Sequence, residues 1–295
     1  ARAWCTERGR VFPLHLAEHR GEVELLAHGG GEFAELLRLR VLPEGFRAPG
    51  CSPAAHARDR RRDEKRERIL AGAVDLSLEA VRSTTRTAEN FLRVVTWDEP
   101  NFSAENIDLG MWQPQAFLKN LGFGLYVLDE FDPNRKVIVM VHGISDSPRV
   151  FRELADAIPD DYQLLLFHYP SSSPLEYTSY ALGELLDEVV QRYDVAQIDV
   201  LAHSMGGLVS KGMIYQASPD LRERLRLFIS IASPFGGHAA ASHGVKWAPV
   251  VAPVWWAMAP GSPYLQKIGS LDLSGGPTHH LFYTYSHERG GERQE

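Results

Sequence analysis

From about residue 100 onward, short apolar runs alternate with segments whose apolar residues have helical spacing. The runs are separated by turn-forming residues, as at Asp132-Pro133-Asn134, and are typical of buried strands. Strands are predicted at Leu125–Leu128, Val137–Val141, Leu164–His168, Ile198–Ala202, Leu227–Ala232 and Leu281–Tyr285. Helices are predicted at Val150–Ile158, Tyr180–Tyr193 and directly after Ser204. This alternation predicts an α/β fold, with a mostly parallel central sheet and helices on both faces.

The first hundred residues lack this alternation. Residues 1–68 mix Gly, Arg, Glu and Leu without a sustained period, and a dense run of mixed charge fills 56–68. We therefore expect an irregular or poorly ordered, charged extension there. Residues 69–100 have apolar positions at helical spacing and are predicted to form a helical docking segment. The α/β domain is then expected to span 101–295.

The composition is that of an ordinary soluble globular protein. Of the 295 residues, 44% are hydrophobic, and 31 Lys and Arg against 38 Asp and Glu give a formal net charge of −7. This mildly acidic balance gives no support for nucleic-acid binding. No uninterrupted apolar run reaches the roughly 18 residues of a spanning helix, so we expect a soluble protein, either cytoplasmic or of the cell envelope.

The sequence also contains no motif for a metal or a cofactor. Its two cysteines, Cys5 and Cys51, define neither a disulfide framework nor a metal site. No C-x-x-C, H-E-x-x-H or P-loop string occurs. We therefore expect neither a metal nor a cofactor, and the sequence leaves the oligomeric state open.

The strongest chemical signal is a serine between the predicted strand Ile198–Ala202 and the helix that follows it. Ser204 is flanked by small residues, with Ala202 two positions before it and Gly206 two positions after it. A serine at a sharp strand-to-helix turn projects its hydroxyl clear of the sheet, and the turn leaves no room for large neighbours. This context predicts that Ser204 is a nucleophile; an ordinary strand-to-helix loop is the alternative.

A second motif follows the predicted strand Val137–Val141. Gly143 lets the backbone turn, so that the N–H of Ile144 can face the serine. Attack on a carbonyl carbon places negative charge on its oxygen, which two backbone N–H groups can stabilise as an oxyanion hole. The predicted donors are Ile144 and Met205. We expect His142 to support this loop rather than to act as a base, and Gly143 and Gly206 to permit the close packing.

These paired motifs resemble the α/β-hydrolase fold superfamily, specifically its bacterial serine esterase and lipase branch. The resemblance is carried by VHGI (141–144) and AHSMGGL (202–208), and it covers about residues 100–290. Further similar pieces are FSAENIDLGMWQP (102–114), YPSSS (169–173), SPFGGHAA (233–240) and APVWWAMAPGSPYL (252–265). The resemblance implies Ser204 as nucleophile and the amides of Ile144 and Met205 as oxyanion hole. It does not specify the substrate.

The sequence departs from the family pattern in the rest of the catalytic triad. The family order is serine, then an acid, then a histidine, and the last two follow later strands. Only ten residues follow Tyr285, and they contain no Asp-Gly pair. We therefore expect the acid and the histidine beyond Glu295 in a longer parent chain, with residues 1–295 nearly inactive alone. The less favoured candidates for the base are His168, His238, His279, His280 and His287, the last beside Glu288.

An apolar insertion at 238–262 is the candidate substrate cap. Trp247, Trp255, Trp256 and Met258 are its candidate pocket residues. They could line an acyl pocket or contact a lipid interface, because tryptophan favours such boundaries. Core packing beneath a proline-rich loop is the equally weighted alternative.

The function expected from these motifs is hydrolysis of carboxylic esters through an acyl-enzyme on Ser204. The expected partner is a small-molecule ester with an apolar acyl group, with a lipid interface as a further option. An acyltransferase or thioesterase would use the same elbow, and a hydrolase-fold protein that binds without catalysis also stays open.

Overall fold

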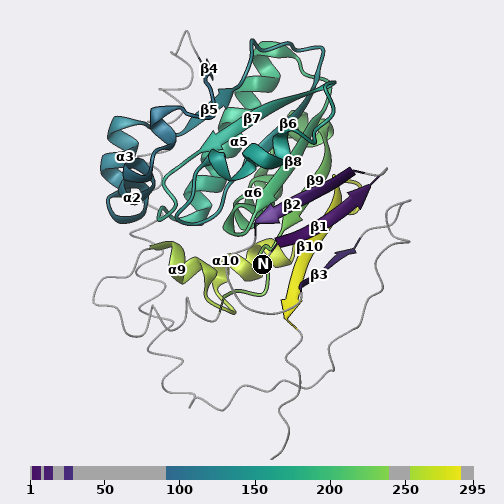
Figure 1. Cartoon of the computed structure of the whole chain (residues 1–295). Coiled ribbons are helices and arrows are strands. Elements are labelled where there is room, and N and C mark those ends of the chain that lie inside the picture. The colour runs from purple at the N-terminus through teal and green to yellow at the C-terminus, as the bar shows by residue number, and fades with distance from the viewer. Residues whose placement is uncertain (1, 8–9, 16–22, 29–90, 239–252, 287–295) are drawn as a thin grey trace, which may run out of the picture.

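The computed structural model describes residues 2–7, 10–15, 23–28, 91–238 and 253–286 (Figure 1). Within these ranges, eight strands form one sheet in the order β3-β10-β9-β8-β6-β7-β5-β4. Their bounds are β3 Val23–His28, β4 Leu92–Val94, β5 Gly124–Val127, β6 Lys136–Val141, β7 Tyr162–His168, β8 Ile198–His203, β9 Leu225–Ile231 and β10 Thr278–Ser286. The six predicted strands correspond to β5 to β10, which confirms the α/β class.

The centre of the sheet is parallel. β6 pairs in parallel with β7 on one side and with β8 on the other, and β8, β9 and β10 continue the parallel pairing. β5 is antiparallel to β7, and β3 is antiparallel to β10. The carboxyl ends of β6, β7, β8 and β9 therefore meet at one edge, where ligands bind in open α/β sheets.

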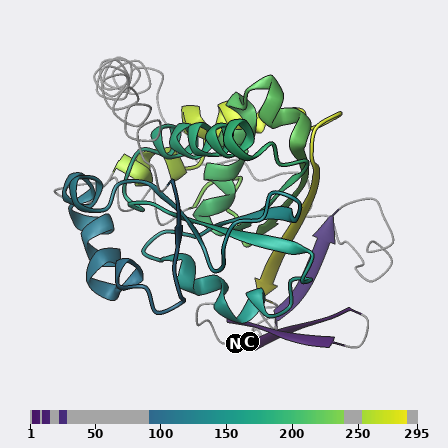
Figure 2. The same ribbon diagram turned by 90° about the horizontal axis from the view of Figure 1, so that it is seen from above.

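Helices cover both faces of the sheet, as predicted. Figure 2 shows α5 (Leu175–Tyr193) lying across one face, and α6 (Met205–Gln216) packs beside it. The 3₁₀ turn η3 (Pro148–Phe151) packs against β6 and β7 and continues into α4 (Arg152–Ala155). The remaining helices are η2 Pro100–Phe102, α2 Ala104–Trp112, α3 Pro114–Asn120, α7 Pro219–Arg224, α9 Pro253–Met258 and α10 Pro263–Gly269.

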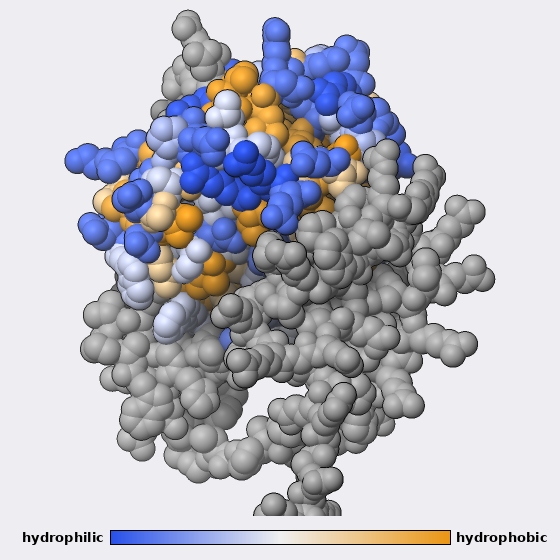
Figure 3. Space-filling model, in the orientation of Figure 1, coloured by the Kyte–Doolittle hydropathy of each residue, from blue (hydrophilic) through white to orange (hydrophobic). Residues whose placement is uncertain are grey.

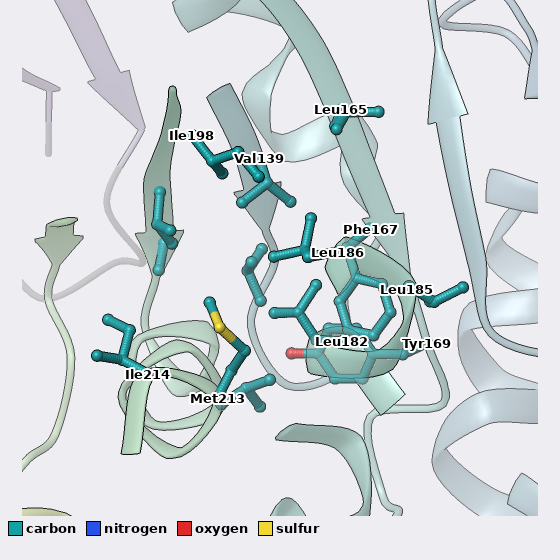
Figure 4. Close-up of a cluster of buried hydrophobic side chains, with 14 of the residues drawn as sticks. Val139, Leu165, Phe167, Tyr169, Leu182, Leu185, Leu186, Ile198, Met213 and Ile214 are labelled. Atoms are coloured by element: carbon teal, nitrogen blue, oxygen red, sulfur yellow. The ribbon is translucent and has the colours of Figure 1, made fainter. Parts of the chain in front are cut away.

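Successive side chains of a strand point to opposite faces of the sheet, and this divides the core into two layers. On β6, Val137, Val139 and Val141 are buried in the larger cluster, which also contains side chains of α5 and α6 (Figure 4). The alternate residues Ile138 and Met140 are buried in the smaller cluster on the other face, together with Phe151 of η3. Because both faces are covered, the central strands are predominantly apolar, and this made them predictable.

The expectation of an irregular extension over residues 1–68 is wrong where the structure describes it. β1 (Arg2–Glu7) and β2 (Arg10–His15) pair antiparallel, with Glu7 opposite Arg10. β3 pairs with β10, at the edge of the main sheet. The physical reason is long-range pairing: β10 supplies the hydrogen bonds for β3 from more than 200 residues away, which no local pattern reveals.

Three helix predictions also need correction. Leu92–Val94, inside the predicted helical segment 69–100, forms β4 because β5 offers it a parallel pairing edge. Residues 29–90 lie outside the described ranges. The helix predicted at Val150–Ile158 is instead the short η3–α4 pair. The helix predicted from Tyr180 already begins at Leu175. The sequence pattern missed its first turn because Thr178 and Ser179 are polar although they are buried.

Figure 3 shows one face of the molecule, where hydrophilic residues separate smaller apolar groups. No helix in the described ranges is both long enough and apolar enough to cross a bilayer.

Candidate active site

Ser204 is held at a strained turn between β8 and α6. β8 ends at His203 and α6 begins at Met205, so Ser204 alone makes the turn, with φ 52° and ψ −124°. A non-glycine residue adopts such angles only where its surroundings enforce them. Here the N–H of Ser204 donates to the carbonyl of Ile231 at 2.8 Å, and its own carbonyl accepts from Gly207 N–H at 3.0 Å. The local geometry is that of a nucleophile elbow.

The two glycines after Ser204 are required by close packing. A Cβ on Gly206 would lie 2.1 Å from the carbonyl oxygen of Val141, and one on Gly207 would lie 2.0 Å from Oγ of Ser233. Contacts under 3.0 Å do not occur between real Cβ atoms and such atoms. Because Gly206 and Gly207 have no side chains, α6 can pack against the end of β6 and against the residues that follow β9.

The residues after β6 lie directly against the elbow. A Cβ on Gly143 would be 3.1 Å from Cβ of Ser204, so the backbone of residues 142–145, here called the 142–145 loop, passes beside the serine. Within the described part of the chain, no hydrogen bond occupies the N–H of Ile144. Met205 opens α6, and its N–H is one of those that a helix leaves without an internal acceptor. Both N–H groups can therefore donate to a ligand oxygen.

The imidazole of His142 is buried and turned onto its own loop. Its Nδ1 lies 2.9 Å from the carbonyl oxygen of Gly143, and its ring stacks on Tyr169 at a centroid distance of 4.2 Å. Burial lowers the pKa of His142 to about 3, so the ring is neutral near pH 7. Since a carbonyl only accepts, Nδ1 carries the proton in this contact. Nε2 is buried and makes no hydrogen bond to a described residue.

The other candidate histidines lie elsewhere in the fold. His168 ends β7 and is enclosed by aromatic rings, with Phe102 at 5.2 Å and Phe117 at 5.0 Å between centroids. His279 stacks on Phe228, and its Nε2 lies 2.8 Å from Oγ of Ser230. Burial lowers the pKa of His168 well below its usual value and that of His279 to about 4.

The structure also describes His203, His238 and His280. His280 lies at the amino end of β10, opposite Ile229, and His238 is exposed. His203 precedes Ser204, and burial lowers its pKa. His287 and Glu288 lie outside the described residues. Within the described ranges, no histidine is hydrogen-bonded to the Ser204 hydroxyl.

The described residues of the 238–262 cap include the helix α9. Met258 and Val254 are buried in the large core cluster, Trp255 packs against that cluster, and Trp256 is 38% exposed. α9 is also tied to the residues after β9, because His238 N–H donates to the carbonyl of Met258 at 2.9 Å. Trp247 lies outside the described residues. Part of the insertion therefore packs as core, and the exposed ring is that of Trp256.

The roles of three polar residues at this edge were not anticipated from the sequence. Asp146 follows the 142–145 loop, and burial raises the pKa of its carboxyl to about 6. Tyr169 and Ser171 follow β7 and hydrogen-bond to the loop. The available signal was their position after the end of a strand, but the sequence does not reveal that β7 is the neighbour of β6. No cluster of three potential metal ligands occurs among the described residues.

Comparison with known proteins identifies the fold. Residues 136–250 match the profile of the alpha/beta hydrolase fold family. An uncharacterized hydrolase of Bacillus subtilis (strain 168), YugF, is 27% identical over 128 residues, which are 41% of this chain and 45% of that protein. The chain thus matches less than half the length of this relative.

Solved structures similar to the chain include two lipases and an esterase. Mature Bacillus licheniformis lipase BlEst2 has a TM-score of 0.39 and 17% identity, covering 48% of this chain and 68% of that one. Aspergillus fumigatus lipase B has a TM-score of 0.39 and 15% identity, covering 48% and 36%. A marine microorganism esterase has a TM-score of 0.31 and 18% identity, covering 42% and 46%. The family match spans β6, the elbow and β9, and it identifies residues 136–250 as an alpha/beta hydrolase fold.

Proposed function

We propose that this protein is a serine hydrolase that cleaves carboxylic esters through an acyl-enzyme. The observation that carries the proposal is the strained Ser204 at φ 52°, packed against the 142–145 loop. The N–H groups of Ile144 and Met205 beside it have no acceptor in the described part of the chain. A turn of this kind costs about 1–3 kcal/mol and persists only where the fold enforces it. The match of residues 136–250 to a hydrolase fold family agrees with this assignment.

In the proposed reaction, Oγ of Ser204 attacks the ester carbonyl carbon and loses its proton to a base. The carbonyl oxygen becomes an oxyanion, which accepts hydrogen bonds from the N–H groups of Ile144 and Met205. Collapse of this intermediate expels the alcohol, which takes up the proton, and leaves an acyl-enzyme. Water then attacks the acyl-enzyme, and the carboxylic acid is released.

We propose that the base lies outside the described ranges. A serine hydroxyl is a weak nucleophile near pH 7 without one. Three of the described histidines are held by other partners: His142 by its own loop, His168 in an aromatic cage and His279 on Ser230. Their lowered pKa values also make each of them a poor proton acceptor at neutral pH.

We further propose an ester with an apolar acyl group. Support comes from α9, which combines buried Val254 and Met258 with the partly exposed ring of Trp256. Esters of p-nitrophenol with acyl chains of two to twelve carbons test this idea. We expect kcat/KM to rise with chain length at first, and a maximum at acetate would contradict the apolar pocket.

The test of the reaction itself is hydrolysis of p-nitrophenyl butyrate by the natural protein and its Ser204→Ala variant. We expect the variant to lose about 10³-fold or more in kcat. Equal activity in both proteins would overturn the proposal. A protein that binds esters without turning them over is the second candidate, favoured because no histidine among the described residues is hydrogen-bonded to Ser204. It would bind the ester in both forms and hydrolyse it in neither.

A further inference from the structure

We propose that Tyr169 is a positioning residue that fixes the 142–145 loop, so that the N–H of Ile144 points at the substrate oxygen. This inference rests on the proposed function, because it assigns Ile144 as an oxyanion donor. Tyr169 directly follows β7, the strand beside β6, and is buried. Its hydroxyl donates a 2.5 Å hydrogen bond to the carbonyl oxygen of His142, the first residue of the loop.

The contact fixes the peptide at the point where the loop meets the elbow. A Cβ on Gly206 would lie 2.5 Å from this same carbonyl oxygen of His142, so the first turn of α6 packs directly against it. The Tyr169 ring also stacks on the ring of His142, at a centroid distance of 4.2 Å. On its other neighbour, Phe167, the centroid distance is 5.0 Å (Figure 4). Tyr169 therefore contacts both the backbone and the side chain of the residue that begins the loop.

The orientation is transmitted through planar peptides. The imidazole of His142, held by the Tyr169 ring, donates from Nδ1 to the carbonyl of Gly143 at 2.9 Å. That carbonyl and the N–H of Ile144 belong to one planar trans peptide, and they point in opposite directions. Fixing the Gly143 oxygen therefore fixes the direction of the Ile144 N–H. Tyr169 acts on the donor through His142.

The far end of the loop is tied to the same segment. The N–H of Ser145 donates to Oγ of Ser171 at 3.0 Å, and Ser145 has φ 50°. Ser172 in turn donates from its N–H and its hydroxyl to the carbonyl of Gly110 in α2, at 3.3 and 2.9 Å. Residues 169–172 thus hold both ends of the 142–145 loop and are themselves anchored to α2.

The Tyr169 hydroxyl keeps its proton throughout the working pH range. Burial raises the pKa of Tyr169 well above its usual value, and the nearby Asp146 carboxylate adds to the shift. The group is therefore a donor at every pH at which an esterase assay is run. Burying a hydroxyl without a hydrogen-bond partner costs free energy, so the bond to His142 stabilises the buried Tyr169. Because the hydroxyl is uncharged, replacing Tyr169 by phenylalanine removes this bond without leaving an unpaired charge.

The experiment replaces one hydroxyl at each end of β7. Tyr169→Phe keeps both ring stacks and removes only the hydrogen bond to His142. Tyr162→Phe is the matched control, because its hydroxyl donates to Asp199 at 2.9 Å at the opposite end of the strand, about 23 Å away along seven residues. The natural protein and both variants are compared in p-nitrophenyl butyrate hydrolysis, fluorophosphonate labelling and exchange of the Ser145 amide hydrogen.

We expect kcat and the labelling rate of Tyr169→Phe to fall about tenfold, less than the 10²–10³ of a deleted donor, with KM changed less than twofold. We also expect faster exchange at Ser145. Tyr162→Phe should match the natural protein in all three. If Tyr169→Phe retains the natural kcat, or loses activity only through KM, the positioning role is wrong. If the natural protein is not labelled and does not hydrolyse the ester, the proposed function is wrong. In that case, unchanged exchange at Ser145 in Tyr169→Phe would also refute the proposal that Tyr169 holds the 142–145 loop.

Discussion

The Cα of Gly206 packs against the backbone of Val141, so closely that a Cβ at position 206 would lie 2.1 Å from the Val141 carbonyl oxygen. This contact joins the first turn of the elbow helix to the end of the neighbouring strand. It sets the distance between Ser204 and the 142–145 loop, on which the proposed chemistry depends.

Gly206→Ala is expected to destabilise the protein strongly. Alanine in a helix is normally favoured over glycine by about 0.5–1 kcal/mol. Here the overlap with two backbone carbonyls outweighs that gain, because overpacking costs about 1–3 kcal/mol or more. We expect a net loss of about 2 kcal/mol in urea unfolding. Gly236→Ala is the matched control, since no atom lies within 4 Å of its Cβ. Its stability should stay within about 0.5 kcal/mol of the natural protein, and equal effects would contradict the packing account.

Ser204→Gly should be more stable than Ser204→Ala. Both remove the hydroxyl, but alanine keeps the strain of φ 52°, which costs about 1–3 kcal/mol. Glycine relieves this strain and loses about 0.5–1 kcal/mol through the greater freedom of the unfolded chain. Urea unfolding should therefore rank glycine above alanine by about 1 kcal/mol. The reverse order would mean that the turn is not strained.

Asp146→Asn should stabilise the protein at neutral pH. Burial raises the folded-state pKa of Asp146 to about 6 from 3.8, so stability falls as the pH rises from about 4 to 6 and stays lower above that. Asparagine does not titrate, and it can still accept the hydrogen bond from Ser147 N–H. Allowing for solvent screening, we expect a gain of about 1–2 kcal/mol at pH 7.5 that shrinks toward pH 5. A gain independent of pH would contradict the assignment.

His168→Phe should reduce the sensitivity of the fold to acid. The folded protein holds His168 neutral, whereas the unfolded chain takes up a proton below about pH 6.5. Stability therefore falls as the pH drops below 6.5, by up to about 1.4 kcal/mol per pH unit for this residue. Phenylalanine suits the aromatic surroundings of Phe102 and Phe117. Urea unfolding between pH 5 and 7.5 should give a flatter curve, and parallel curves would refute the buried neutral state.

The central strands and the elbow were predictable because each is encoded locally. Strands β6 to β8 each contain a short apolar run, since both faces of the sheet are covered. Ala202, Gly206 and Gly207 mark a turn without room for side chains. The predictions failed for β3 and β4, whose hydrogen-bonding partners are distant in sequence.

The contacts of Tyr169 and Ser171 with the 142–145 loop could not be predicted for the same reason. They depend on β7 lying beside β6, and sequence order alone does not set the order of strands in a sheet. Asp146 carries no motif either. Its raised pKa comes from burial, which appears only when the loop is folded against its neighbours.

Covalent labelling of Ser204 is the most direct test of the account. The natural protein is treated with a fluorophosphonate, and intact mass spectrometry followed by peptide mapping locates the adduct. We predict one adduct per chain, on the peptide that contains Ser204, and none in Ser204→Ala. An unlabelled natural protein, or an adduct that persists in Ser204→Ala, would contradict the proposal that Ser204 is the nucleophile.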